Sequence, residues 1–253
     1  MGRLSQMIEF RNIYKSFGSK HVLRNVSVNA EKGTILFIVG ISGAGKSVLV
    51  KHLVGLMKPD AGQVLLDGVD VTHFTEKAFY PVRMRCAMVF QHSTLFDSMN
   101  LVENVTLPLR KHKGLKGKEA TNAAMGFLKR VQMDHMAEKF PSDIGDGLRK
   151  RVAIARALTL SPDFVIFDEP TTGLDPMAAA NVDQLIRALS VEQGVTSIVV
   201  SHDLRSIFTV ADRIAMIYQG EVRLEGTPKE FRATADPVIQ QFIRGLAEGP
   251  MIL

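Results

Sequence analysis

Eight consecutive residues of this chain have the types and spacing of a phosphate-binding loop. Residues 40–47 are Gly-Ile-Ser-Gly-Ala-Gly-Lys-Ser, which match G-x-x-x-x-G-K-[ST] without a mismatch. In such a loop several backbone N–H groups point at one phosphate cluster, the lysine reaches the β- and γ-phosphates, and the final hydroxyl can ligate Mg²⁺. The sequence therefore predicts a site for a nucleoside triphosphate. Its predicted contact residues are Gly40, Ser42, Gly43, Ala44, Gly45, Lys46 and Ser47.

Two carboxylates at the end of a second apolar run could complete this chemistry. Residues 164–169 are Phe-Val-Ile-Phe-Asp-Glu. We expect this strand to lie beside the strand that leads into the phosphate loop, with Asp168 holding Mg²⁺ directly or through water. Glu169 is then placed to polarise the attacking water as a general base. An Asp-Glu pair alone is a weak signal, because it is common in turns. Together with the upstream loop it predicts nucleotide hydrolysis.

A parallel sheet is needed to position these side chains. Residues 35–39 predict a buried strand that enters the loop, residues 47–56 predict the helix that leaves it, and residues 196–200 predict a further strand. Strands and helices alternate from residue 34 onward, which indicates a parallel core. The motif Ser201-His202-Asp203 closes the last strand. Adjacent residues point in different directions, so these three do not form the converging triad of a serine hydrolase.

Two other regions have different patterns. The segments 7–30 and 63–71 alternate in polarity and contain turn signals, which predicts an antiparallel β-subdomain flanking the nucleotide. Between residues 92 and 160 the strand signal vanishes and helix patterns dominate. We expect those helices to be broken at Pro108, Gly114, Gly117 and Pro141.

The order of the motifs points to a family. Residues 151–158 are Arg-Val-Ala-Ile-Ala-Arg-Ala-Leu, and residues 168–176 are Asp-Glu-Pro-Thr-Thr-Gly-Leu-Asp-Pro. With the phosphate loop and His202, this order closely resembles the nucleotide-binding subunits of ABC transporters over nearly the whole chain. The resemblance implies an α/β fold, in which a RecA-like P-loop core carries an antiparallel β-subdomain and an inserted helical subdomain. It also implies ATP and Mg²⁺ as ligands.

The same resemblance implies one ABC nucleotide-binding domain over residues 1–253. The catalytic core with the β-subdomain is expected at about 7–91 and 161–235, and the helical subdomain at about 92–160. A C-terminal tail is expected at 236–253.

Four further residues receive roles from this resemblance. Gln91 is the Q-loop glutamine, near Mg²⁺ and the membrane partner, and Asp175 is the D-loop aspartate at the dimer seam. His202 is the switch histidine that contacts the γ-phosphate. Tyr14 lies where the family stacks an aromatic ring on adenine, although packing within an N-terminal strand is the alternative for this ring.

The signature loop departs from the family pattern. ABC ATPases usually carry Leu-Ser-Gly-Gly-Gln there, whereas residues 144–148 are Ile-Gly-Asp-Gly-Leu. Gly145 replaces the serine and Asp146 replaces the first glycine, while Gly147 is retained. This loop normally binds the γ-phosphate held by the opposite subunit of a head-to-tail dimer. We therefore expect a second ATPase subunit, either a copy of this chain or a different one with an intact signature loop. A slow homodimer is expected.

A narrower resemblance concerns the cargo. Residues 89–105, the run Pro108-Leu109-Arg110 with the basic segment after it, and the tail 236–250 look like the ATPases of Mla-type lipid transporters, the MlaF family. This family works with an integral membrane permease and with MCE-domain lipid-binding proteins, and it moves phospholipids or other lipids in the cell envelope. The family tail can run further and reach the neighbouring subunit, so that contact is in doubt for a chain ending at Leu253.

Composition limits the other possibilities. No signal peptide and no apolar stretch of membrane-span length is visible, so we expect a peripheral protein on the cytoplasmic face of the inner membrane. The net charge of +5 suits an anionic surface, but we expect the excess to be spread over solvated surface. A different cargo and a regulatory subunit of low turnover remain alternatives. An ABC ATPase acting on DNA or ribosomes is disfavoured, because paired cassettes and long coiled-coil insertions are missing. No nucleic-acid partner is expected.

Overall fold

A six-stranded, mostly parallel sheet forms the centre of the molecule. The structure is a computed structural model that describes residues 7–251, and the strand order of this sheet is β10-β9-β3-β8-β7-β6. The strands are β3 Ile35–Val39, β6 Cys86–Val89, β7 Phe164–Asp168, β8 Thr196–Val200, β9 Arg213–Tyr218 and β10 Glu221–Gly226. Every residue of β3, β7 and β8 is buried. Their nearly unbroken apolar sequences follow from this, because a parallel sheet is covered on both faces.

The strand that carries Asp168 does not lie beside the strand that enters the phosphate loop. β3 pairs in parallel with β8 and β9, whereas β7 pairs with β8 and β6. The expectation of direct neighbours is therefore wrong, because β8 lies between the two. An apolar run contains no information about its pairing partner. Asp168 still reaches the loop, since parallel strands end at the same edge of the sheet.

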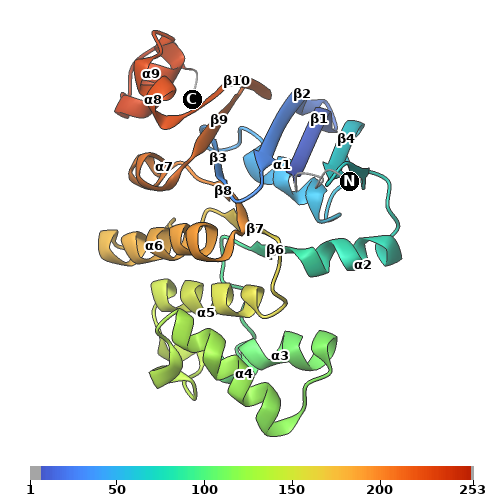
Figure 1. Cartoon of the computed structure of the whole chain (residues 1–253). Coiled ribbons are helices and arrows are strands. Elements are labelled where there is room, and N and C mark those ends of the chain that lie inside the picture. Colours follow the sequence, from blue (N-terminus) through green and yellow to red (C-terminus); the bar gives the residue numbers. More distant parts are fainter. Residues whose placement is uncertain (1–6, 252–253) are drawn as a thin grey trace.

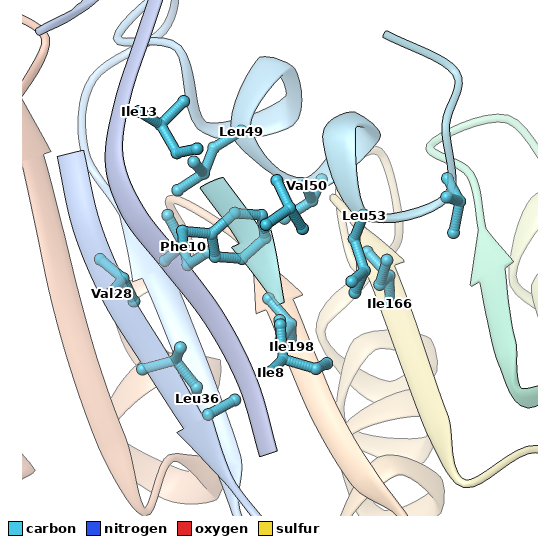
Figure 2. Close-up of a cluster of buried hydrophobic side chains, with 14 of the residues drawn as sticks. Ile8, Phe10, Ile13, Val28, Leu36, Leu49, Val50, Leu53, Ile166 and Ile198 are labelled. Atoms are coloured by element: carbon cyan, nitrogen blue, oxygen red, sulfur yellow. The ribbon is translucent and has the colours of Figure 1, made fainter. Parts of the chain in front are cut away.

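A smaller antiparallel sheet packs against one face of the central sheet, with helix α1 between them. Its order is β2-β1-β4-β5, and its strands are β1 Met7–Phe17, β2 Lys20–Glu31, β4 Ala61–Leu66 and β5 Val69–Asp70. Helix α1 spans Lys46–Leu53, and the predicted residues 54–56 form a turn after it. Figure 2 shows Leu49, Val50 and Leu53 of α1 close to Phe10 of the small sheet and Ile166 of the central sheet.

Helices cover the opposite face. α5 Asp146–Leu158, α6 Pro176–Gln193 and α7 Leu204–Val210 contribute to the second core cluster, together with α9 Pro237–Arg244. The short helix α8 Pro228–Ala233 precedes α9. The chain after α9 folds back on that helix, because the Met251 N–H donates to Oε1 of buried Gln241 at 2.6 Å. Figure 1 shows these last elements at the end of the molecule farthest from α3 and α4.

Residues 92–160 contain no strand and form a lobe of helices, which is joined to the central sheet through α5 (Figure 1). α3 Leu101–Lys113 and α4 Gly117–Arg130 pack with α5 around their own core cluster. Short 3₁₀ turns follow at Asp134–Met136 and Pro141–Asp143. Helix α2 Glu76–Arg85 leads from the small sheet into β6.

The predicted break at Pro108 is wrong. α3 runs through Pro108 and ends at Gly114, which takes the left-handed conformation at φ 69°. A proline inside a helix costs about 3 kcal/mol. α3 tolerates this cost because a capping box at Asn100 and Glu103 holds its start and because its apolar face is buried against α4 and α5. Pro141 does lie at a turn, and Gly117 begins α4.

Candidate active site

The phosphate loop connects β3 to α1, and close contacts require two of its glycines, Gly40 and Gly45. A Cβ on Gly40, at φ 146°, would lie 2.3 Å from the carbonyl oxygen of Ile217. A Cβ on Gly45, at φ 97°, would lie 2.7 Å from a methyl group of Leu23. Gly45 is the N-cap residue of α1 and has no side chain that could accept from the first N–H groups of this helix. The first N–H groups of the helix are thus available to an anion.

Lys46 is held inside the loop. Its Nζ donates to the carbonyl oxygens of Gly40 and Ile41, each at 2.9 Å, and lies 4.0 Å from Oε1 of Glu169. The side chain is 6% exposed. Burial lowers the pKa of Lys46, while the charges of Glu169 and Asp168 act in the opposite direction. The loop therefore presents a cation next to two carboxylates.

The hydroxyl and carboxylate predicted to bind a metal are in direct contact. Ser47 Oγ donates to Oδ1 of buried Asp168 at 2.6 Å. This contact joins the start of α1 to the end of β7. Two side-chain oxygen atoms thus lie side by side at the carboxyl edge of the sheet, where ligands bind in open α/β folds.

Glu169 lies at the centre of a small polar network. It takes a left-handed conformation at φ 50°, and its N–H donates to the Val200 carbonyl oxygen at 2.9 Å. Its Oε2 accepts a hydrogen bond from Thr172 Oγ1 at 2.8 Å and lies 2.9 Å from Nδ1 of His202. The carboxylate is mostly buried, whereas the side chain of His202 is 57% exposed. The strained backbone and these contacts fix the direction of the carboxylate.

Thr172 lies inside the motif at residues 168–176, but its type and position in the sequence predict no role for it. A threonine three residues after a carboxylate can contact it when the chain turns back. The turn at 170–173 makes that contact here. The spacing alone is too common to have singled this threonine out.

Gln91 lies in the loop after β6, and a second residue missed by sequence reasoning holds this loop. Gln91 is exposed and lines a hollow together with Asp146 and Thr172. Lys150 of α5 donates to the carbonyl oxygen of Phe90 at 2.9 Å and also to that of Gln91. Lys150 is buried, and burial lowers its pKa to about 8, against the charges of Asp168, Asp146 and Glu169. Helix α5 is thereby joined to the Q-loop backbone.

The remaining predicted residues lie apart from this network. Tyr14 is 43% exposed on β1. Gly145 precedes the first residue of α5, Gly147 lies in its first turn, and Asp175 caps α6 by accepting from two backbone N–H groups. Within residues 7–251, no side-chain hydrogen bond joins Gly145, Gly147 or Asp175 to the cluster around Glu169. The first turns of α5 and α6 touch, because a Cβ on Gly147 would lie 2.9 Å from Cβ of Ala178.

The fold and this edge of the sheet define a P-loop nucleotide hydrolase. A family profile described as ABC transporter matches residues 23–172. The phospholipid transport ATP-binding protein MlaF of Escherichia coli K12 is 34% identical over 248 residues, which cover 98% of this chain and 92% of MlaF. The probable ribonucleotide transport ATP-binding protein mkl of Mycobacterium leprae is 37% identical over 245 residues, 96% of this chain and 70% of mkl. The chain therefore belongs to the ABC transporter family.

Solved structures agree with this assignment. The dimeric ATP-binding cassette MJ0796, bound to ADP and Pi after hydrolysis, has a TM-score of 0.80 and 31% identity, covering 87% of this chain and 98% of that chain. CbiO1 of Clostridium perfringens, part of the ABC transporter complex cbiONQ, has a TM-score of 0.83 and 28% identity, covering 95% of this chain and 96% of that chain. The predicted fold class is confirmed.

These relationships give the biochemical role of the chain. It is the ATP-binding subunit of an ABC transporter and an ATP hydrolase. Subunits of this family dimerise and work peripherally with a membrane permease. None of the helices in residues 7–251 has the length and apolar character needed to cross a bilayer.

Proposed function

We propose that this subunit hydrolyses Mg-ATP to drive phospholipid transport in the cell envelope. The contact network at the end of β7 is the observation that supports Mg-ATP hydrolysis. Ser47 and Asp168 present hard oxygen ligands 2.6 Å apart, which suits Mg²⁺, and Gln91 adds an amide oxygen from the adjoining loop. When bound, the metal neutralises phosphate charge. Lys46 then faces the β- and γ-phosphates, and Tyr14 stacks on adenine.

Glu169 is the general base in this proposal. Its carboxylate accepts the proton of the attacking water, and Thr172 and the φ 50° backbone hold it in one direction. His202, exposed and 2.9 Å from the same carboxylate, reaches toward the γ-phosphate. Positioned charges of this kind account for most of the catalysis of phosphoryl transfer.

A second ATPase subunit completes each site in this proposal. Within residues 7–251, no side-chain hydrogen bond joins Gly145, Gly147 or Asp175 to the Glu169 cluster of their own chain, which supports a head-to-tail dimer in which they face the partner's nucleotide. The partner is a second copy of this chain, or a different ATPase with an intact signature loop.

We expect repair of the signature loop to raise the hydrolysis rate of the homodimer several-fold. Two unit charges 4 Å apart interact by roughly 4 kcal/mol at an effective dielectric of 20, so a carboxylate at position 146 should weaken γ-phosphate binding more than one neutral hydrogen bond, worth about 1 kcal/mol, could restore. Asp146 Oδ1 lies 2.8 Å from a guanidinium nitrogen of Arg149, which offsets part of this repulsion. The measurement is steady-state phosphate release by the Gly145→Ser, Asp146→Gly double variant.

The two single variants separate the hydroxyl from the charge. If repulsion dominates, Asp146→Gly alone gives most of the increase and Gly145→Ser gives little. If the parental chain already hydrolyses ATP rapidly and neither change alters this rate, Arg149 keeps the Asp146 carboxylate away from the phosphate.

A groove between the core and the helical lobe is proposed as the permease site. It has a volume of about 310 Å³ and lies between the turn after α1, α2, β6, α3 and α5, with Leu56, Arg83, Met88, Ser93, Pro108 and His112 among its lining residues. Leu56 on its rim is 53% exposed. The groove shares the Phe90 backbone with the loop that Lys150 holds, so a partner seated here would reach Gln91 through that loop.

Substitutions in this groove should disrupt the coupling of ATP hydrolysis to transport and leave basal ATP hydrolysis intact. Leu56→Glu should abolish co-isolation of the integral permease, because a charge replaces apolar contact area, while basal ATP hydrolysis stays within about twofold. Gln91→Ala should retain the complex and lose transport. Val191→Glu is the matched control, because it introduces the same charge at an exposed apolar side chain on α6, outside the groove. If Leu56→Glu and changes at residues 93–100 leave the complex intact and transport coupled, these residues only cover the helical lobe.

The cargo assignment rests on relatives, because an ATP-binding subunit does not itself contact the cargo. MlaF, which is named for phospholipids, is matched over 92% of its length, whereas mkl, which is named for ribonucleotides, is matched over 70%. This supports lipid as cargo, an MCE-domain lipid-binding protein as a further partner, and a position at the cytoplasmic face of the inner membrane. The mkl name makes ribonucleotide transport the second candidate.

Purification of the subunit with its co-isolating membrane proteins would decide between the cargoes. The reconstituted complex should exchange fluorescent phospholipid between membranes in an ATP-dependent manner, and added ribonucleosides or ribonucleotides other than ATP should not stimulate hydrolysis. Stimulation by these compounds without lipid exchange would favour the second candidate.

A further inference from the structure

One short stretch of this chain contains as many cations as the whole chain has in excess. Residues 110–118, called the basic segment below, contain Arg110, Lys111, Lys113, Lys116 and Lys118 and no carboxylate. The whole chain has 31 Lys and Arg residues against 26 Asp and Glu residues, so outside the basic segment there are 26 of each. Positive charge is thus dense in this segment, although residues 10–30 and 147–162 each also contain four cations and no carboxylate.

The structure places this charge where α3 ends and α4 begins. The basic segment is the end of α3, the connection at 114–116 and the start of α4, and all five cationic side chains are exposed. Among the described residues, none of the five takes part in a salt bridge. Lys113 has one weak contact, from Nζ to Ser161 Oγ at 3.5 Å. The charges are thus available to a partner.

Local helix electrostatics explain only part of this arrangement. Cations are favourable at the C-terminus of a helix, which accounts for Arg110, Lys111 and Lys113 in the last turn of α3. The same effect disfavours Lys116 and Lys118, because Lys116 precedes the first residue of α4 and Lys118 lies in its first turn. Glu119 is the one carboxylate there. The chain tolerates two cations where the helix opposes them, which points to an external anion.

The basic segment borders the groove proposed for the permease. His112 lines that groove, and its Nδ1 lies 2.7 Å from the hydroxyl oxygen of Tyr80 on α2, which fixes the end of α3 beside α2. Figure 1 shows α3 and α4 at the end of the molecule away from the C-terminus. A permease seated in the groove brings the neighbouring surface toward the bilayer. This step rests on the proposed function.

We propose that the basic segment is a membrane-contact surface that binds the headgroups of anionic lipids beside the permease. Each lysine or arginine near an anionic bilayer contributes about 1 kcal/mol, roughly a fivefold increase in partitioning. Attraction of this kind falls off within about 10 Å at moderate salt. Five exposed cations within nine residues act together at that distance.

The test is sedimentation of the full chain, without permease, with large vesicles. One set consists of phosphatidylcholine alone and the other of equal parts phosphatidylcholine and phosphatidylglycerol. The parental chain should bind the second set at low salt, lose binding at high salt and ignore the first set. In the test variant all five cations of the basic segment are replaced by Gln, and binding should fall at least about 100-fold. A control variant removes the same charge from five exposed cations elsewhere, namely Lys32, Lys129, Lys139, Lys229 and Arg244.

The control variant should bind within about threefold of the parental chain, and basal ATP hydrolysis should be unchanged in both variants. Three results would overturn the proposal: no parental binding to the anionic vesicles, equal losses in the two variants, or tighter parental binding to duplex DNA through the same five residues. The last result would identify a nucleic-acid surface. Because the vesicles contain no permease, a failure of the groove proposal would leave this measurement unaffected.

Discussion

The Glu169→Gln variant is expected to bind ATP as the parental chain does and to hydrolyse it about a hundredfold more slowly, or slower still. The amide has the shape of the carboxylate and can still accept a hydrogen bond from Thr172, so the turn at 170–173 should persist. It cannot accept the proton of the attacking water. Single-turnover phosphate release measures the loss, and light scattering should detect a closed dimer that accumulates with ATP.

Glu192→Gln is the matched control, because that glutamate is exposed on α6 and makes no contact with the site. It should hydrolyse ATP at the parental rate. If Glu169→Gln also keeps the parental rate, the φ 50° conformation and the contacts around Glu169 have a structural role, and another residue polarises the water.

Loss of the Lys46 ammonium should reduce hydrolysis at least as strongly as Glu169→Gln. It should do so by weakening ATP binding, which precedes the chemical step. A hydrogen bond to a charged group contributes about 1.5–3 kcal/mol, so Lys46→Ala should weaken ATP affinity roughly 10- to 100-fold and remove detectable hydrolysis. Isothermal titration measures the affinity, and steady-state phosphate release measures turnover.

Lys51→Ala, five residues further along α1, is the control for this change. It removes a lysine from the same helix outside the phosphate loop, and affinity should stay within about twofold. Thermal unfolding without nucleotide should show that both variants are folded. Unchanged turnover in a folded Lys46→Ala variant would place the lysine outside the active site.

The local parts of this site could be predicted because each depends on a few consecutive residues. Glycine spacing sets the curl of the loop from Gly40 to Gly45, and no distant contact is needed to recognise it. The five-residue apolar runs that became β3, β7 and β8 were recognisable for the same reason. The signature loop could be aligned only because the motif at 151–158 fixes its register. These features follow from backbone conformation and burial alone.

Pairing and packing across the fold could not be predicted. Nothing in an apolar run specifies its neighbour, so the insertion of β8 between β3 and β7 came from the assembled sheet. α3 runs through Pro108 because tertiary burial outweighs a local cost. The sequence around Lys150 does not show which group this lysine contacts. Its hydrogen bonds to the Q-loop carbonyl oxygens depend on how α5 packs against that loop.

The basic segment shows most directly which properties the sequence determines and which depend on the tertiary structure. The five cations of the basic segment can be counted in the sequence, and so can the neutrality of the remaining residues. Their shared exposure, their lack of ion pairs within residues 7–251 and their position beside the groove depend on how α3 and α4 meet α2. Sequence alone determined which groups this protein can use, since chemistry belongs to residue types and to short spacings. The tertiary structure decided which of them meet, because contacts between distant segments depend on the packing of the whole chain.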